Sequence, residues 1–298
     1  MKTNNKHKNS KAGYKLVSLL CFVIIFPFNS FSGSSEKTDQ ITLTYKLDHF
    51  YGLNIKSGFD IVLHQFEADP GQLKLSGTEN QLKNVKFEVI DGVLNLSSGI
   101  KTENSQPIKV YVTFTDLQLI KTQGIVNITT QENMCLKKIN LDLSEETYLT
   151  LFVSSLDFMC DASGKGTVNI SGDITNFRLS CSSETVIDCN VLTHNLYTYL
   201  QDETQVNVKG KADFFQVKVI NESFLNAYDL KTSDCVVTVG DYGDACLSVS
   251  KTLEITGTKD GSVSYNGAPV ITNRYVSESV FVRSNKSKKS KELTTYKK

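Results

Sequence analysis

The feature that most constrains the fold is a repeat of about 19 residues in the second half of the chain. Its units begin at Ile139, Phe158, Phe177, Leu196, Phe215, Cys235 and Leu253. Within each unit, apolar or small residues occupy the first, third and usually fifth positions, and a second apolar pair follows ten and twelve residues after the start. This alternation is typical of strands with one buried face. Two short strands that recur at a fixed period predict a parallel β-solenoid, in which each coil is buried by its neighbours.

The segment between the two strands of each unit is small and polar, as in Ser182-Ser-Glu-Thr185, and therefore predicts a turn. One of these segments, Gly164–Thr167, looks like a phosphate-binding loop. Cys160, four residues before Gly164, is not part of a glycine-rich loop, Gly166 follows the lysine, and a strand pattern follows instead of a helix. We therefore interpret this segment as a corner of the repeat and expect no nucleotide.

Residues 41–120 show the same alternating pattern with a looser period, broken by turn signals. Asp91-Gly92 between two apolar runs predicts a hairpin. We expect a mixed or antiparallel β region at 33–120 that continues into solenoid repeats at 121–282. Residues 283–298 contain seven basic residues and one glutamate, which is typical of a disordered basic tail.

The first 32 residues have the pattern of an export signal. Five lysines precede an apolar run of 11 residues at 16–26, and small residues follow at Ser30 and Ser32. The run is short for a transmembrane helix. We expect the segment to be cleaved and the protein to be exported to the periplasm, the outer surface or the medium, and an uncleaved signal would be its only membrane contact.

The charge is unevenly distributed although the net charge is zero. Both ends are basic, so the middle of the chain is acidic, which does not suit a nucleic-acid-binding protein. His49, His64 and His194 are far apart in sequence and form no metal-binding motif. We expect no metal site, no cofactor and no catalytic residue.

The cysteines after the signal fall mostly in apolar columns, which favours buried thiols that do not react. Cys160 is third in its coil and Cys181 is fifth in the next. This offset puts their Cα atoms about 8 Å apart, beyond the reach of a disulfide. We therefore expect no disulfide bond among Cys160, Cys181, Cys189 and Cys235.

The outward positions form the candidate working surface. Arg178, Tyr197, Tyr199 and Lys218 are expected side by side on one face, where aromatic rings flanked by cations suit a sugar or a protein partner. A second column reads Thr150, Asn169, Asp188, Asn207 and Asn226, which we interpret as a structural ladder, with calcium or glycan contact as the alternative.

Several stretches, SGFDIVL (57–63), GIVNI (124–128), GTVNISGDI (166–174) and DGSVSYNGAPVI (260–271), resemble the auto-transporter adhesin head domain, or head GIN domain. The resemblance covers roughly residues 45–280. It implies an all-β, right-handed β-helix and an exported protein of Bacteroides-like bacteria. Several turns carry Glu-Thr where the family often has Ser-Gly-Ser, so we expect a more acidic edge. With its lysine-rich end, the chain is not expected to form the translocating barrel of a complete autotransporter.

The leading hypothesis is a non-enzymatic exported solenoid, an adhesin or cell-envelope component, that binds an unknown protein or glycan at the cell surface. The alternative is a protein that binds or cleaves polysaccharides, because long β-helices also carry lyases and hydrolases. A cleaving enzyme needs clustered carboxylates in a cleft. Glu145, Glu184, Glu203 and Glu222 are instead expected along a solvated ridge. A purely structural spacer is the third possibility.

Overall fold

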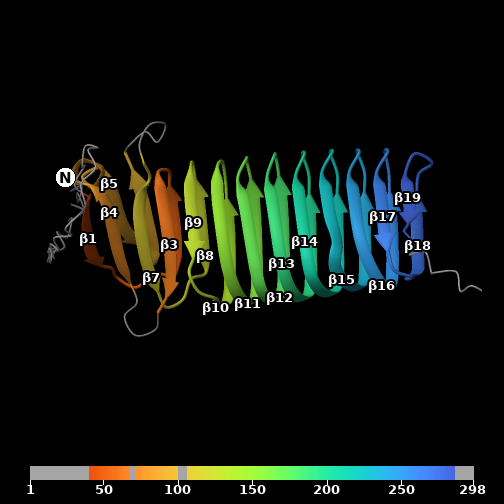
Figure 1. Ribbon diagram of the computed structural model, residues 1–298, viewed down its shortest axis with the longest axis horizontal. Coiled ribbons are helices and arrows are strands. Elements are labelled where there is room, and N and C mark those ends of the chain that lie inside the picture. The colour runs from red at the N-terminus through yellow and green to blue at the C-terminus, as the bar shows by residue number, and fades with distance from the viewer. Residues whose placement is uncertain (1–39, 67–70, 100–105, 286–298) are drawn as a thin grey trace, which may run out of the picture.

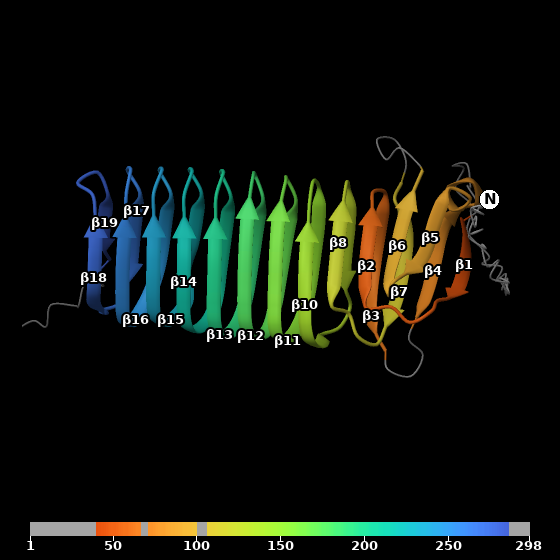
Figure 2. The same cartoon turned by 180° about the vertical axis from the view of Figure 1, so that it is seen from behind.

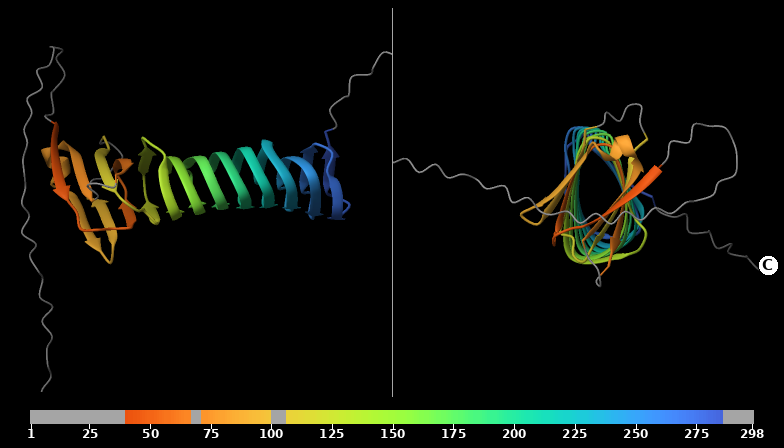
Figure 3. Two further views of the ribbon diagram at one scale, coloured as in Figure 1. Left: turned by 90° about the horizontal axis from the view of Figure 1, so that it is seen from below. Right: turned by 90° about the vertical axis from the view of Figure 1, so that its left-hand side faces the viewer.

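The protein is an elongated two-sided β-solenoid in its computed structural model, which describes residues 40–66, 71–99 and 106–285. The expected export signal and residues 286–298 lie outside these ranges. About 9 coils of ~19 residues stack along the long axis (Figure 1), and the end-on view in Figure 3 shows a flattened cross-section with two broad sides. We call the side that contains β3 and β9 the front sheet (Figure 1) and the side that contains β2 and β8 the back sheet (Figure 2).

The strands fall into three groups along the chain. The N-terminal strands are β1 (Gln40–Lys46), β2 (Gly52–Lys56), β3 (Phe59–Gln65), β4 (Gln72–Thr78), β5 (Val85–Ile90), β6 (Val93–Ser98), β7 (Ile108–Phe114), β8 (Leu119–Gln123) and β9 (Val126–Thr130). The long strands of the regular coils are β10 (Met134–Leu143), β11 (Thr147–Ser163), β12 (Thr167–Ser182), β13 (Val186–Leu200), β14 (Gln205–Val219), β15 (Phe224–Val239) and β16 (Asp244–Gly257). The last three are β17 (Ser262–Asn266), β18 (Val270–Val276) and β19 (Phe281–Ser284).

The pairing of the long strands confirms the register that the repeat predicts. Phe158 pairs with Phe177 one coil later, and Phe177 pairs with Leu196. All pairings from β10 to β16 are parallel. Each strand from β11 to β16 bends near its middle, so that its first half lies in the front sheet and its second half in the back sheet. The starting residues of the repeat are therefore equivalent positions in space.

The N-terminal region is mixed, as expected, but its coils do not stack in sequence order. The coil of β2 and β3 lies between β6–β7 on one side and β8–β9 on the other, through parallel pairing. Beyond it, β4 pairs antiparallel with β7 and with β1. The Asp91-Gly92 signal forms the expected hairpin of β5 and β6, with both residues at positive φ. The short helix α1 (Glu79–Leu82) begins with a capping box formed by Thr78 and Gln81.

The core is one continuous apolar interior between the two sheets. Its residues are the inward positions of every coil, and its largest fully buried side chains include Phe59, Phe114, Phe158, Phe177 and Phe215. The rings of Phe158 and Phe177 meet edge to face, with centroids 5.1 Å apart. Because each coil covers the next, burial depends on stacking along the axis.

Tight turns form one long edge of the solenoid, and the Gly164–Gly166 segment is one of these turns. The chain there adopts the left-handed conformation, as at Gly164 (φ 110°). A Cβ on Gly166 would lie 2.0 Å from the carbonyl oxygen of Thr147 in the preceding turn. Glycine is needed because neighbouring turns approach this closely. β12 begins at Thr167, so a strand follows the turn and no helix N-terminus faces it.

Candidate functional site

The four predicted surface residues lie together on the outer face of the back sheet. Arg178 pairs with Tyr197 in one outward column, and Tyr199 pairs with Lys218 in the column two positions further along the strands. They come from β12, β13 and β14, and the alternation of each strand turns them all outward. Arg178 and Lys218 are exposed, and both tyrosines are half-buried. We call these four residues the cation–tyrosine patch.

Each tyrosine of the patch carries a cation over its ring. The Arg178 guanidinium carbon lies 5.6 Å from the Tyr197 centroid, and Lys218 Nζ lies 5.2 Å from the Tyr199 centroid. Phe214 flanks Tyr197 with centroids 6.0 Å apart. Cation–π attraction of this kind holds flexible side chains in place. The patch therefore presents two positioned positive charges, one on β12 and one on β14.

The patch lines an open groove of about 530 Å³. The groove extends past the patch to Met159, Asp161, Gln216 and Thr238. Asp161 is its one acidic lining residue, and burial raises the pKa of that carboxyl, with a further contribution from the charge of Asp142 and an opposing hydrogen bond from Ser180. The groove thus combines apolar stacking area, cations and one carboxyl that protonates more readily than usual.

The additional groove residues were not predicted, although the repeat contains the signal for them. Met159 and Gln216 occupy the outward column of Arg178 and Tyr197 on the coils before and after. Asp161 occupies the column of Tyr199. Extending each column by one coil in either direction would have identified them.

The polar ladder on the front sheet joins successive coils through its side chains. Asn207 donates to Asp188 at 2.9 Å, and Asn226 donates to Asn207 at 3.4 Å. Amide and carboxyl groups here satisfy one another, which supports the structural interpretation. No group of three or more His, Cys, Asp or Glu side chains in the described ranges is arranged to hold a metal ion.

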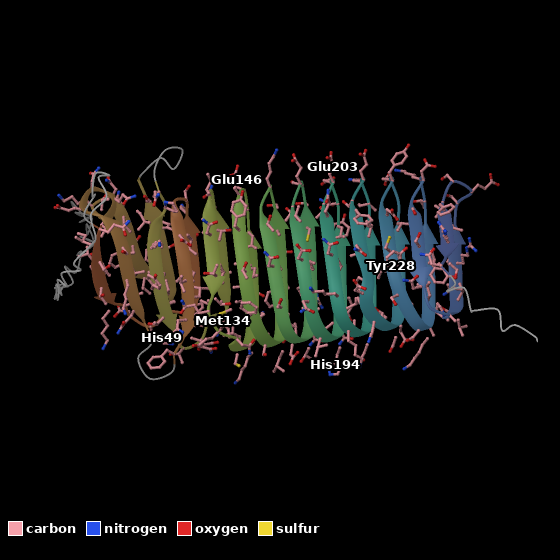
Figure 4. All side chains as sticks on the ribbon, in the orientation of Figure 1. His49, Met134, Glu146, His194, Glu203 and Tyr228 are labelled. Carbon is pink, nitrogen blue, oxygen red and sulfur yellow. The ribbon has the colours of Figure 1, made fainter. Side chains whose placement is uncertain are left out.

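The acidic turn residues lie along the tight-turn edge and away from the groove. Figure 4 labels Glu146 and Glu203 on this edge, and His194 on the opposite edge. Glu145, Glu184, Glu203 and Glu222 are all exposed. Lys165, the lysine of the phosphate-loop look-alike, lies 3.0 Å from Glu184 on the next turn. Its charge is directed at a neighbouring side chain along the ridge.

Cys160, Cys181, Cys189 and Cys235 are buried free thiols, while Cys135 is exposed. Cys160 pairs with Leu179, and Cys181 pairs with Ala162. The two cysteines are therefore offset by two positions along adjacent strands, as the repeat predicts. Burial raises the pKa of all four buried thiols far above the ordinary value. They remain protonated and act as small apolar core residues.

The described residues contain no helix of the length and apolarity that a membrane crossing requires.

No curated protein matches the chain. Among solved structures, a putative adhesin from Parabacteroides merdae has a TM-score of 0.63 at 16% identity, covering 83% of this chain and 97% of that one. A putative adhesin from Parabacteroides distasonis has a TM-score of 0.64 at 16% identity, with coverage of 83% and 98%.

A third structure, described as a putative lipid binding protein from Parabacteroides distasonis, has a TM-score of 0.59 at 16% identity, with coverage of 83% and 97%. These likenesses establish the fold. The family model described as "Putative auto-transporter adhesin, head GIN domain" matches residues 49–199 and 175–269. The matched segments span most of the solenoid, and the chain belongs to this head GIN domain family.

Proposed function

We propose that this protein is an exported, non-enzymatic β-solenoid that binds a protein or glycan through the cation–tyrosine patch. Membership of an adhesin family supports a role in binding at the cell surface. The observation that carries the proposal is the pair of cation–tyrosine contacts on adjacent coils, which line one groove. A spacer needs no such arrangement, whereas a binding surface gains from aromatic rings and cations that are already positioned.

The experiment is a glycan and host-protein array probed with the exported protein and with two variants, Tyr197→Ala and Tyr199→Ala. Tyr148→Ala and Tyr111→Ala are matched controls, because these tyrosines are 42% and 41% exposed on the front sheet. We expect the groove variants to lose about tenfold or more in affinity, as for a binding hot spot, and the controls to bind like the wild type. Binding that survives both groove substitutions would place the site elsewhere.

A polysaccharide-cleaving activity is the second candidate, and Asp161 is the residue that favours it. A carboxyl with a raised pKa beside a second carboxyl is the arrangement that glycoside hydrolysis uses. Asp161 lines the groove, and Asp142 pairs with it one coil away. Asp142 is already engaged by Lys121, whose Nζ lies 2.5 Å from its carboxylate. Release of reducing ends from a polysaccharide by the wild type, with none from Asp161→Asn, would support this alternative over the binding role.

A further inference from the structure

Three cations form a diagonal row on the outer face of the back sheet. Lys138 lies on β10, Arg178 on β12 and Lys218 on β14, and all three are exposed (Figure 2 shows the order of these strands). The strand register places each cation two coils beyond the last and two residues further along the strand. With coils about 4.8 Å apart and residues about 3.3 Å apart, neighbouring cations are separated by about 12 Å at their Cα atoms. We call these three residues the cation row.

One continuous depression contains the whole cation row. Met159 and Arg178 line the groove of the cation–tyrosine patch and also line a second hollow of about 200 Å³. This second hollow is further lined by Lys138, Asp157 and Asn176. Because the two hollows share residues, the groove continues beyond the patch as far as β10. It therefore crosses the strands and follows the long axis of the solenoid.

The three cations of the row form no ion pair with any carboxylate of the described residues. Asp157 is directly opposite Lys138, yet it accepts a hydrogen bond from Asn176 at 3.0 Å on its other side. Elsewhere on the solenoid, exposed lysines such as Lys121 and Lys165 are held by a carboxylate of the next coil. The row therefore keeps its positive charges available for charge-assisted hydrogen bonds to an anionic ligand.

The spacing of the row favours a ligand with widely separated charges. A nucleic-acid strand carries one phosphate about every 3.4 Å, which is several times denser than the row. Asp157 and Asp161 also lie on β11, between the first two cations, and would repel the additional negative charges. A linear glycan with a carboxylate in every second sugar has its charges far apart and neutral hydroxyl groups between them.

An extended peptide can also carry charges at wide intervals, but this groove lacks what a peptide needs. Every strand from β10 to β14 is paired on both sides, so the groove has no free edge for strand addition. Between and beside the cations, the groove is lined by hydroxyl and amide groups of Ser180, Gln216 and Thr238 and by the rings of Tyr197 and Tyr199. Polar groups and aromatic rings in this arrangement suit the hydroxyls and ring faces of sugars.

We propose that the cation row binds a linear acidic glycan that lies along the solenoid axis, with one carboxylate at each cation and neutral sugars between them. The inference rests on the proposed binding function of the cation–tyrosine patch. It adds the class of the ligand, its direction across the coils and a third charged contact, Lys138, which lies outside the patch.

The test uses end-labelled hyaluronan oligosaccharides, which carry one carboxylate in every second sugar, and measures binding by fluorescence anisotropy. A hexasaccharide supplies a carboxylate for each of the three cations. We expect Lys138→Gln, Arg178→Gln and Lys218→Gln each to weaken its binding about tenfold, as for the loss of one hydrogen bond between charged groups. Lys209→Gln is the matched control and should bind like the wild type, because this exposed lysine lies in the first half of β14 and outside the groove.

The length of the oligosaccharide gives a second readout for the same variants. A tetrasaccharide supplies only two carboxylates, which Arg178 and Lys218 can hold beside the tyrosines. Lys138→Gln should therefore leave tetrasaccharide binding within about twofold of the wild type, the statistical loss of one of two binding positions. Cellohexaose, which has no charge, and a galacturonate hexamer, which has a carboxylate in every sugar, should both bind more weakly than the hyaluronan hexasaccharide.

Three results would overturn the inference. One is cellohexaose binding as tightly as the hyaluronan hexasaccharide. The second is a galacturonate hexamer that binds more tightly, which would identify a site for dense polyanions. The third is hexasaccharide binding that Lys138→Gln weakens no more than Lys209→Gln does.

The array experiment separates failure of this inference from failure of the proposed function. A protein ligand that is lost with Tyr197→Ala and Tyr199→Ala, together with no hyaluronan binding, would overturn the acidic glycan and leave the binding function of the patch in place. Array binding that survives both tyrosine substitutions, together with no hyaluronan binding, would overturn both.

Discussion

The Arg178 guanidinium lies 5.6 Å from the centroid of the Tyr197 ring, and the two residues are directly paired on adjacent coils. The contact is therefore made across the stacking direction, and it joins β12 to β13 outside the core. The cation also covers one face of the ring. In the proposed binding role, the exposed guanidinium favours anionic groups of a glycan or protein over neutral ones.

A double-mutant cycle should measure this contact in the free protein. Arg178→Ala and Tyr197→Ala, singly and together, should give a coupling free energy of unfolding of about 0.5–1 kcal/mol, as for an exposed cation–π pair. Urea unfolding of the four proteins measures it. The cycle of Arg178→Ala with Tyr148→Ala, on opposite sheets, should give no coupling. A coupling near zero in the first cycle would show that the patch is not held in place.

Gly166→Ala adds a single methyl group but should destabilise the protein strongly. The new Cβ would lie 2.0 Å from the Thr147 carbonyl oxygen, and backbone on both coils would have to shift. We expect a loss of about 1–3 kcal/mol in the free energy of unfolding, in the range of backbone strain. Gly99→Ala is the matched control, because its Cβ would come no closer than 3.8 Å to its neighbours. Similar unfolding midpoints for the two variants would contradict the close stacking of the turns.

The repeat register could be predicted from sequence because each coil repeats the same inward positions, and the pairing of Phe158 with Phe177 follows from counting. The additional groove residues can be predicted by extending the same 19-residue register by one coil. The spatial order of the N-terminal coils cannot be predicted in this way. Leu53 pairs with Leu94 on one side and with Ile120 on the other, so a coil is placed between two that follow it in sequence. Alternation identifies strands, but it does not state which strand lies beside which.

The structure of the C-terminal coil also lies beyond sequence periodicity. Ile271 occupies an apolar column like Leu253 before it, yet it is 38% exposed, because within the described residues no later coil covers it. The alternating pattern shows which side of a strand faces inward, but an inward residue is buried only when a further coil stacks on its own coil. The sequence analysis expects the solenoid repeats to end at residue 282 and a basic tail to follow. The strand β19 runs two residues further, to Ser284, and the tail itself stays a prediction.

Two buried threonines should respond oppositely to replacement by valine. The Thr204 hydroxyl donates its one proton to the carbonyl oxygen of Gln201 at 2.5 Å, with the carbonyl oxygen of Ser183 at 3.3 Å as the longer alternative, while the Thr198 hydroxyl is buried without a partner. Thr204→Val should cost about 1–3 kcal/mol because the part-buried carbonyl of Gln201 loses its donor. Thr198→Val should be neutral or stabilising, because it removes an unsatisfied polar group. Equal losses in urea unfolding would argue against a stabilising hydrogen bond from the Thr204 hydroxyl.

Thiol reactivity should separate Cys135 from the four buried cysteines. A thiolate is the reacting species, and burial raises the pKa of Cys160, Cys181, Cys189 and Cys235 far above neutral pH. Iodoacetamide should modify Cys135 in the folded protein and reach the others only on unfolding. Peptide mass spectrometry before and after denaturant gives the result. A cysteine among the four that reacts as fast as Cys135 would show that the core opens there.

Two carboxylates should give opposite pH dependence. Hydrogen bonds from His194 and Lys211 lower the pKa of Asp213 from its ordinary value of 3.8, whereas burial raises the pKa of Asp161 above it. A lowered folded pKa means that Asp213 stabilises the fold above the unfolded pKa, and that this stability is lost as pH falls through the folded value. Asp213→Asn should therefore lower the unfolding midpoint at neutral pH and converge with the wild type in acid.

For Asp161 the sign is reversed. A raised folded pKa means that folding favours the protonated carboxyl, so the ionised form lowers stability once pH rises above the unfolded value. Asp161→Asn should match the wild type in acid and exceed it at neutral pH. Urea midpoints of the wild type and both variants, measured from neutral pH down through the carboxylate range, give the comparison. Curves for the two variants that shift in the same direction would contradict the raised pKa of the Asp161 carboxyl.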